Sequence, residues 1–125
     1  MGRGDMFLGI DVGTSSLKAV VLDVDGSIVG TGSAAYSLTT AQPGWAESDP
    51  QAWWEAAATA VREATGQQAS EVAAIGLCGQ MHGVVLSDDA GEPLRPAILW
   101  ADSRARRQLG AYEALSGEHR RQLAN

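Results

Sequence analysis

The sequence predicts an α/β domain in which a mixed sheet is flanked by helices. Three observations lead to this prediction. Three short apolar segments of strand-like composition follow one another within residues 7–36, and one amphipathic segment of about fifteen residues comes next. A second group of apolar segments, each followed by a polar turn, then precedes helical patterns at the end of the chain.

The first strands are expected at 7–12, 17–22 and 27–36. Between the second and third, the pair Asp25-Gly26 is a two-residue hairpin signal. Two glycines inside the third segment indicate a bulge there. The chain is therefore expected to open with a meander of three antiparallel strands.

A helix is expected at 51–65. Asp49 before Pro50 supplies an N-cap residue followed by a proline at the first helical position, and Gly66 ends the pattern. Its apolar face is predicted from residues at helical spacing, which are Trp53, Ala57, Ala60, Val61 and Ala64.

The apolar run 72–78 is continuous, which is typical of a strand covered on both faces. Its Cys78 is the only cysteine of the chain, so it forms no internal disulfide and is expected to be a buried structural thiol. The remaining elements expected are strands at 84–87 and 97–100, a hairpin turn at 88–91, and helices at 102–115 and 118–124.

The chain has 125 residues, a formal net charge of −6 and 45% hydrophobic residues, which suffices for one domain with a core. Net negative charge disfavours nucleic acid and anionic membrane surfaces as partners, because both attract Lys and Arg. No secretory signal and no membrane-spanning run is recognised, so a cytoplasmic location is expected. Residues 1–5 are interpreted as a leader and residues 6–125 as the domain.

The first candidate site is the turn 11–16, with the sequence DVGTSS. Asp11 at the end of a strand can hold a metal ion directly or through water, and the backbone N–H groups after it can approach phosphate oxygens. Phosphoryl transfer uses such parts, because it is catalysed mostly by positioning and charge neutralisation. The alternative is an ordinary hairpin with Asp11 bonded to nearby amides. Candidate ATP phosphate contacts are Gly13, Thr14, Ser15 and Lys18, the last of which is otherwise a solvated strand residue.

The second candidate site is the segment 79–83, GQMHG. Gln80 and His82 lie between two glycines at the carboxyl end of an expected strand, where ligands bind in α/β sheets. Their amide and imidazole can hydrogen-bond sugar hydroxyls, while Met81 packs against an apolar part of the substrate. The alternative for His82 is an ordinary structural role.

The third candidate site is the segment 100–104, WADSR. Trp100 beside Asp102 and Arg104 offers a flat apolar wall with fixed donors and acceptors, which suits a polyol. The alternative is that Asp102 or Ser103 caps the helix that follows.

Four segments together resemble the FGGY carbohydrate kinases, and among them most closely the xylulokinases. They are GIDVGTSSLKAVVLD, PGWAESDPQAWW, IGLCGQMHGVVL and LRPAILWADSR, in the order and spacing of the family from Phe7 to Arg104. Four linked motifs in one order are more specific than any one of them.

This resemblance implies a ribonuclease-H-like, actin-like ATPase fold, of which the chain would form part of the N-terminal domain. ATP and sugar would meet in a cleft between two such domains, with Asp11 to Ser15 facing the phosphates and Mg²⁺. Met81 and His82 would bind the ketose. Trp100, Asp102 and Arg104 would line the same pocket.

The activity implied is ATP-dependent phosphorylation of D-xylulose to D-xylulose 5-phosphate. The catalytic base and the adenosine-binding domain would lie beyond residue 125, so the chain alone is expected to be inactive. Ala101 stands where many xylulokinases carry Asn, which leaves open another sugar or a sugar acid such as gluconate. Other hypotheses are a non-catalytic actin-like sugar-binding or regulatory module, and a structural domain whose motifs arise by chance. A truncated domain is also expected to expose an apolar face around Ile98, Trp100 and Leu109, and so to self-associate.

Overall fold

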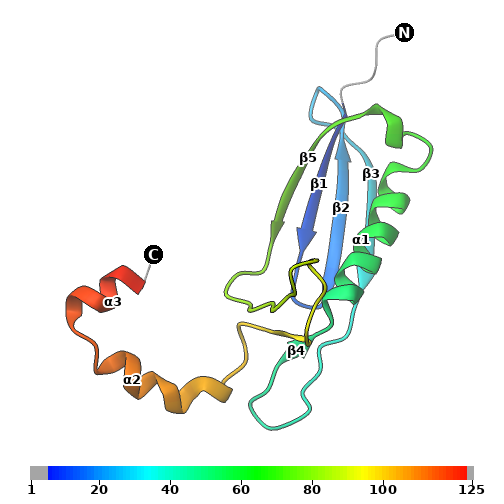
Figure 1. Cartoon of the computed structure of the whole chain (residues 1–125). Coiled ribbons are helices and arrows are strands. Elements are labelled where there is room, and N and C mark those ends of the chain that lie inside the picture. The colour runs from blue at the N-terminus through cyan, green and yellow to red at the C-terminus, as the bar shows by residue number, and fades with distance from the viewer. Residues whose placement is uncertain (1–5, 124–125) are drawn as a thin grey trace.

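The computed structural model describes residues 6–123, so the leader expected at 1–5 lies outside the described residues. A four-stranded sheet forms its centre (Figure 1). Its strands are β1 Met6–Val12, β2 Ser16–Leu22, β3 Ile28–Ala35 and β5 Val72–Gly79. The order across the sheet is β3-β2-β1-β5, with β1 antiparallel to β2 and parallel to β5. The expected mixed sheet and its opening meander are confirmed.

The turn between β2 and β3 is longer than the two-residue hairpin that the sequence predicted. The N–H of Asp23 donates to the carbonyl of Ser27 at 2.9 Å, and the N–H of Gly26 donates to the carbonyl of Asp23 at 2.9 Å. Gly26 has a φ of 84°, which only glycine adopts at low cost. A turn closed by a left-handed glycine is the usual form of these longer hairpin connections.

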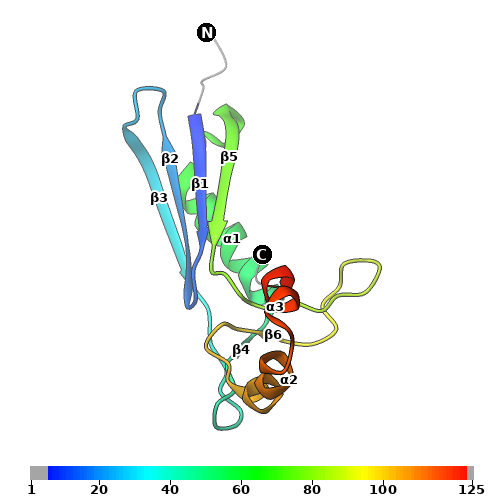
Figure 2. The same cartoon turned by 90° about the vertical axis from the view of Figure 1, so that its left-hand side faces the viewer.

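Helix α1, Pro50–Thr65, begins and ends where the sequence predicted and lies behind the sheet in Figure 2. The Asp49 carboxylate accepts a hydrogen bond from the backbone N–H of Gln51 at 2.9 Å and so caps the first turn. At the other end, the N–H of Gly66 donates to the carbonyl of Arg62 at 3.0 Å. Local signals therefore determine both ends of this helix.

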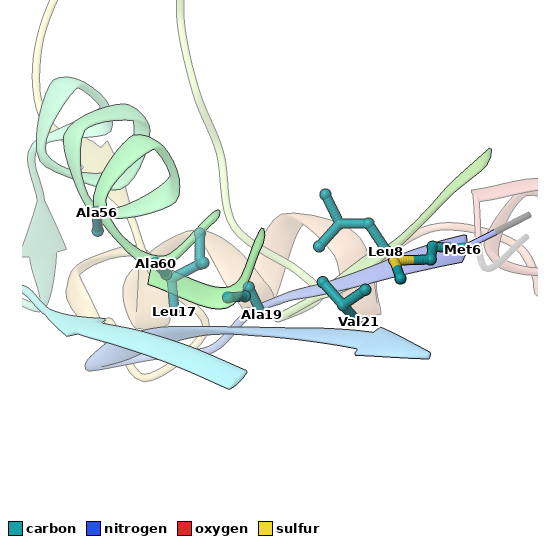
Figure 3. Packing of buried hydrophobic residues seen from close by; sticks show 8 residues of the cluster. Met6, Leu8, Leu17, Ala19, Val21, Ala56 and Ala60 are labelled. Atoms are coloured by element: carbon teal, nitrogen blue, oxygen red, sulfur yellow. The ribbon is translucent and has the colours of Figure 1, made fainter. Parts of the chain in front are cut away.

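The core lies between α1 and the face of β1 and β2 that the helix covers (Figure 3). Leucine and valine side chains of the sheet, including Leu17 and Val21, pack on a stripe of alanines in the helix. The buried helix residues are Ala56, Ala60, Ala64 and Thr65. Of the predicted face, Trp53, Ala57 and Val61 are only half-buried, and Ala56 was not among the residues predicted.

The glycines of β3 allow the helix to approach the sheet closely. A Cβ on Gly30 would lie 2.0 Å from the carbonyl oxygen of Ala64, and one on Gly32 would lie 2.1 Å from that of Ala60. The expected bulge is also present, because Val21 pairs with Gly30 and Leu22 with Ile28, so one extra residue of β3 stands between them.

Strand β5 contradicts the expectation that it is covered on both faces. Ile75 is 63% exposed and Leu77 is 74% exposed, and Cys78 is exposed as well, so the prediction of a buried thiol is wrong. The physical reason is that β5 is an edge strand of the sheet, while α1 packs mainly over β2 and β3. No other part of residues 6–123 pairs with its outer edge.

The segments after β5 form less regular structure than expected. The strand expected at 84–87 is reduced to isolated bridges, Val84 to Ile98 and Ser87 to Pro93, although the turn at 88–91 forms. A small second sheet pairs β4, Glu47–Ser48, with β6, Ala97–Ile98. The remaining elements are a 3-10 helix at Ala69–Glu71, a 3-10 helix at Arg104–Gln108, α2 at Leu109–Glu113 and α3 at Gly117–Leu123.

The helix expected at 102–115 is thus divided into a 3-10 turn and a short α-helix. None of the residues in these two elements is buried, so the segment gains little from packing, and Gly110 inside it lowers its helix propensity. The last helix is close to the one expected at 118–124. Within residues 6–123, no helix has both the length and the apolar character needed to cross a membrane.

Candidate functional site

The predicted phosphate turn lies at the edge of the sheet where parallel strands β1 and β5 both end (Figure 1). Asp11 is exposed near the end of β1. The turn after it is closed by the N–H of Gly13, which donates to the carbonyl of Ser16 at 3.1 Å. The carboxylate and the residues of the turn therefore reach solvent at one edge, as a ligand site requires.

Lys18 stands opposite Asp11 in the register of β1 and β2, and both side chains are exposed on the face of the sheet that α1 does not cover. An open hollow of about 820 Å³ lies over this face and is lined by both residues, together with Cys78. The Lys18 ammonium group, a candidate phosphate contact in the sequence, is thus near the turn.

Cys78 lies beside Asp11, with 3.5 Å between the thiol sulfur and Oδ1. Partial removal from water raises the pKa of the Cys78 thiol, and the hydrogen bond to Asp11 and the charge of that carboxylate raise it further. The thiol therefore stays protonated and donates to the carboxylate. Sequence reasoning missed this neighbour, because Cys78 belongs to another strand, 67 residues away.

Two side chains hold the phosphate turn from behind. The Tyr36 hydroxyl and the Gln80 amide both donate to the carbonyl of Gly13, the amide at 3.3 Å. The backbone N–H of Gln80 also donates to the carbonyl of Val12 at 2.8 Å. Burial, and after it the charge of Asp11, raises the pKa of Tyr36, so its hydroxyl remains a donor. The turn is therefore fixed before any ligand arrives.

The structure places Gln80 differently from the sugar contact that the sequence predicted. Its Nε2 points to the phosphate turn, while its Oε1 is buried without a hydrogen-bond partner among the described residues. An unpartnered buried amide oxygen is costly, and such groups concentrate at functional sites. Tyr36 was not predicted from the sequence at all, because nothing local marks its contact with Gly13.

Met81 and His82 follow Gln80 in an exposed loop that is fastened at both ends. Before them Gln80 bonds to Val12, and after them the N–H of Val84 donates to the carbonyl of Ile98 at 2.8 Å. His82 has a φ of 62°, in the left-handed region that residues other than glycine rarely adopt. Strained backbone of this kind occurs preferentially at ligand-binding sites. The loop thus presents both predicted sugar-binding side chains to solvent.

Trp100 connects the third candidate segment to the phosphate turn. Its indole Nε1 donates to the Thr14 hydroxyl at 3.2 Å, across 86 residues of sequence. Most of the ring remains exposed, with 59% of the residue accessible. The structure therefore brings two of the predicted segments into direct contact.

Asp102 and Arg104 are engaged with each other and with Glu47. The guanidinium Nη2 lies 2.6 Å from Oδ2 of Asp102 and 2.8 Å from Oε1 of Glu47, and Arg95 also contacts Glu47. The guanidinium carbon lies 3.7 Å from the centre of the Trp45 ring, a cation–π contact. The hydrogen bonds from Arg104 hold the pKa of Asp102 well below its usual range, and the same bonds raise that of Arg104. Both side chains therefore hold neighbouring segments together. The sequence offered helix capping by Asp102 or Ser103 as the alternative to a polyol contact. The Ser103 side chain makes no cap bond, whereas Oδ1 of Asp102 accepts the N–H of Arg104 at 2.9 Å where the 3-10 helix begins.

Asp11 is the residue that could hold Mg²⁺. No group of three His, Cys, Asp or Glu side chains in the described part of the chain is arranged to bind a metal. A single exposed carboxylate nevertheless fits Mg²⁺, which keeps several waters and is usually bound by one or two carboxylates together with substrate phosphates.

Comparison with known proteins identifies the family of this chain. Residues 6–122 match the model of the N-terminal domain of the FGGY family of carbohydrate kinases. The xylulose kinase of Escherichia coli (strain K12) is 40% identical over 111 residues, which are 87% of this chain and 23% of that protein. The xylulose kinase of Streptomyces rubiginosus is 43% identical over 104 residues, or 82% of this chain and 21% of that protein.

Solved structures give the same result. The xylulose kinase from Rhodospirillum rubrum has a TM-score of 0.83 at 30% identity, covering 91% of this chain and 24% of that one. A kinase from Brucella ovis, described as a xyloylose kinase, has a TM-score of 0.81 at 40% identity, covering 87% and 23%. The expected actin-like ATPase fold is confirmed, and the chain spans less than a quarter of the length of the curated relatives given above. By sequence and by fold alike, this chain belongs to the FGGY family of carbohydrate kinases and corresponds to part of that family's N-terminal domain.

Proposed function

We propose that this chain supplies the phosphate turn and the sugar loop of an ATP-dependent xylulose kinase, which converts D-xylulose to D-xylulose 5-phosphate. The observation that carries the proposal is the shared edge of the sheet. There the turn that contains Asp11 and Thr14 lies directly beside the loop that contains His82, as the parallel pairing of β1 and β5 requires. Relatives about 40% identical are named xylulose kinases.

The proposed roles follow from these positions. Asp11 holds Mg²⁺, directly or through water, and Lys18 adds positive charge. The turn binds phosphate oxygens through backbone N–H groups and hydroxyls of Gly13, Thr14 and Ser15. ATP supplies the phosphoryl group and Mg²⁺ neutralises the charge that develops on it.

On the sugar side, Met81 and His82 hold the ketose, and the exposed ring of Trp100 forms an apolar wall beside them. Gln80, Asp102 and Arg104 were predicted as sugar contacts too. We now assign them indirect roles, because Gln80 bonds to the turn and the other two bond to each other.

The general base is proposed to come from outside these 125 residues. Asp102 is a poor candidate, because Arg104 stabilises its charged form and a weakly basic carboxylate accepts a proton badly. The chain is therefore expected to bind ligands without turnover by itself. We also propose a cytoplasmic location, no nucleic-acid or membrane partner, and self-association through exposed apolar surface.

A second candidate substrate is a sugar acid. The gluconate kinase from Lactobacillus acidophilus has a TM-score of 0.81 at 30% identity, covering 88% of this chain and 22% of that one. Its TM-score and sequence identity are close to those of the xylulose kinase from Rhodospirillum rubrum. The substrate must therefore be tested directly.

The decisive experiment measures ADP release by the complete protein that carries this sequence, with D-xylulose, D-ribulose, D-gluconate and glycerol as acceptors. We expect D-xylulose to have the highest kcat/KM, Asp11→Asn to abolish turnover, and His82→Ala to raise the ketose KM. Trp54→Phe is the matched control, because Trp54 is an exposed residue of α1 outside the three candidate segments.

Two results would overturn parts of the proposal. If His82→Ala left both the KM and the kcat for the ketose unchanged, the sugar contact would be wrong. If the complete protein bound D-xylulose in equilibrium dialysis but released no ADP, a non-catalytic sugar-binding module would be the better account.

A further inference from the structure

Trp100 lies in a short loop, residues 99–102, that is hydrogen-bonded at both ends to one residue, Ala46. We call this loop together with Ala46 the clamp. The N–H of Leu99 donates to the carbonyl of Ala46 at 2.9 Å, and the N–H of Ala46 donates to Oδ2 of Asp102 at 2.7 Å. A third hydrogen bond, from the N–H of Asp102 to the carbonyl of Leu99 at 3.0 Å, closes the loop on itself. Leu99 and Ala46 are buried, so the base of the clamp is anchored in the second, smaller core.

The clamp leaves the Trp100 ring exposed but fixes its polar end. The backbone on both sides of Trp100 is held, and the indole Nε1 donates to the Thr14 hydroxyl at 3.2 Å. Thr14 itself belongs to the turn that Gly13 closes and that Gln80 supports from behind. Two rigid pieces of backbone therefore meet at a single side-chain hydrogen bond.

The chemistry of a hydroxyl gives this bond a consequence. A threonine hydroxyl has one hydrogen to donate and two lone pairs that accept. Because the indole N–H is a donor only, it occupies a lone pair of Thr14 and leaves the hydroxyl hydrogen to be donated elsewhere. Thr14 lies in the turn proposed to bind phosphate, whose oxygens are acceptors.

We propose that Trp100 is a positioning residue for phosphate binding: its indole N–H orients the Thr14 hydroxyl so that the hydroxyl donates its hydrogen to a phosphate oxygen of the nucleotide. The inference rests on the proposed kinase function and adds a link between its two ligand sites. Asp102 has an indirect role, since its hydrogen bond to Ala46 fixes the clamp that contains Trp100.

The link makes the two sites energetically dependent on each other. A sugar that packs on the exposed Trp100 ring restrains the indole, and the restrained indole holds Thr14 ready for the phosphate. By reciprocity, a bound nucleotide must favour sugar binding by the same factor. The contact is a single neutral hydrogen bond, so we expect its loss to change affinity by about fivefold.

The first test needs no catalysis. In the 125-residue chain, the Trp100 indole N–H resonance is identified by its loss in Trp100→Phe. Thr14→Val, which removes the hydroxyl but keeps the shape, should shift this resonance upfield. Thr14→Ser should restore it, and the indole signals of Trp45, Trp53 and Trp54 should stay in place. An unmoved Trp100 resonance in Thr14→Val would overturn the contact itself.

The second test uses the complete protein with MgATP and D-xylulose. Trp100→Phe keeps an aromatic wall for the sugar but loses the N–H, so the KM for ATP should rise about fivefold while the KM for D-xylulose at saturating ATP changes less. Thr14→Val should show the same pattern, and Trp54→Phe should show neither. The double variant should be no worse than Thr14→Val alone, because the indole acts only through Thr14.

The outcomes separate this inference from the function on which it rests. If the protein phosphorylates D-xylulose and the two single effects on the ATP KM multiply in the double variant, Trp100 does not act through Thr14 and the inference is wrong. If the wild-type protein phosphorylates no sugar, the proposed function fails. The inference then fails with it, whatever the indole resonance shows about the contact.

Discussion

The guanidinium of Arg104 grips the carboxylate of Asp102 with two hydrogen bonds, from Nε to Oδ1 at 2.8 Å and from Nη2 to Oδ2 at 2.6 Å. The Asp102 side chain is only 2% exposed, and its second oxygen also accepts the N–H of Ala46. Residues separated by 56 positions in sequence are thereby fastened together. The pair stabilises the small second sheet and the clamp around Trp100, because paired and hydrogen-bonded charges tolerate burial.

Asp102→Asn should lower the free energy of unfolding at neutral pH. The difference from the wild type should disappear in acid. The carboxyl has an ordinary pKa of 3.8, which Arg104 lowers in the folded state. A depressed folded pKa contributes stability that is fully present above 3.8 and is lost as the pH falls through the lower folded value. Urea unfolding followed between pH 7 and pH 2 should therefore show the wild-type advantage over Asp102→Asn shrinking below about pH 4.

Asp89→Asn is the control for this measurement, because Asp89 lies exposed in the turn at 88–91. It should match the wild type at every pH. An advantage of the wild type over Asp102→Asn that stayed constant down to pH 2 would contradict an ionic role for Asp102.

Gly32→Ala should be destabilising, although replacing glycine by alanine usually stabilises a strand or helix because glycine loses more backbone entropy on folding. Its Cβ would lie 2.1 Å from the carbonyl oxygen of Ala60, so helix α1 would have to move away from the sheet. Overpacking of this kind costs about 1–3 kcal/mol in the free energy of unfolding. Gly76→Ala is the matched control, because no atom lies within 4 Å of its added Cβ. Equal unfolding midpoints for the two variants would refute the close contact between α1 and β3.

Elements with local signals were predicted well from the sequence. Helix α1 begins at the Asp49 cap and ends at Gly66. Each end of the three meander strands lies within one residue of the expected end. Caps, helix-ending glycines and alternating apolar residues act within a few positions, so one segment contains the whole signal. The length of the turn after Leu22 was missed because its geometry depends on the register of both strands.

Contacts between distant segments could not be predicted in this way. The apolar pattern of β5 indicated burial, but burial depends on what packs against a strand, and Ile75 and Leu77 are exposed. Asp102 carries no local sign that it meets Ala46, and Thr14 carries none that it accepts a hydrogen bond from Trp100. The sequence placed each candidate segment at or directly after the end of an expected strand. Only the structure separates those that face solvent from those that hold others in place.

Leu77→Lys should reduce self-association of the 125-residue chain. Leu77 is 74% exposed on a strand whose outer edge is unpaired among the described residues, and a lysine on an edge strand opposes pairing with another copy. The exposed apolar surface thus includes β5. Of the three residues that the sequence pointed to, Trp100 and Leu109 are also exposed, whereas Ile98 is half-buried because it pairs with Glu47 in the small second sheet. Sedimentation velocity over a concentration series should show association of the wild type and a shift toward monomer in Leu77→Lys.

Leu94→Lys provides the control, since Leu94 is 67% exposed outside the main sheet and the substitution changes the net charge equally. If both variants reduced association equally, charge and not the edge of β5 would be responsible. A wild-type chain that stayed monomeric and bound no apolar dye would remove the basis for self-association.

Asp11→Asn should lower the pKa of the Cys78 thiol. Partial desolvation is the main reason that this pKa is raised, and it stays in the variant. The hydrogen bond to the Asp11 carboxylate and its negative charge, which oppose thiolate formation, are lost. Because Cys78 is the only cysteine, its rate of alkylation by neutral iodoacetamide reports the thiolate fraction directly. The pH–rate profile should therefore move to lower pH in Asp11→Asn and stay in place in Asp25→Asn, whose substitution lies in the distant β2–β3 turn.

The same profile tests the proposed metal role of Asp11 without nucleotide or sugar. A magnesium ion at the carboxylate would offset its charge, so adding Mg²⁺ to the wild type should also move the profile to lower pH. In Asp11→Asn that response should disappear, because the carboxylate that attracts the ion is gone. A Mg²⁺ response that persisted in Asp11→Asn would place the ion elsewhere, and a profile unmoved by the substitution would contradict the contact between Asp11 and Cys78 itself.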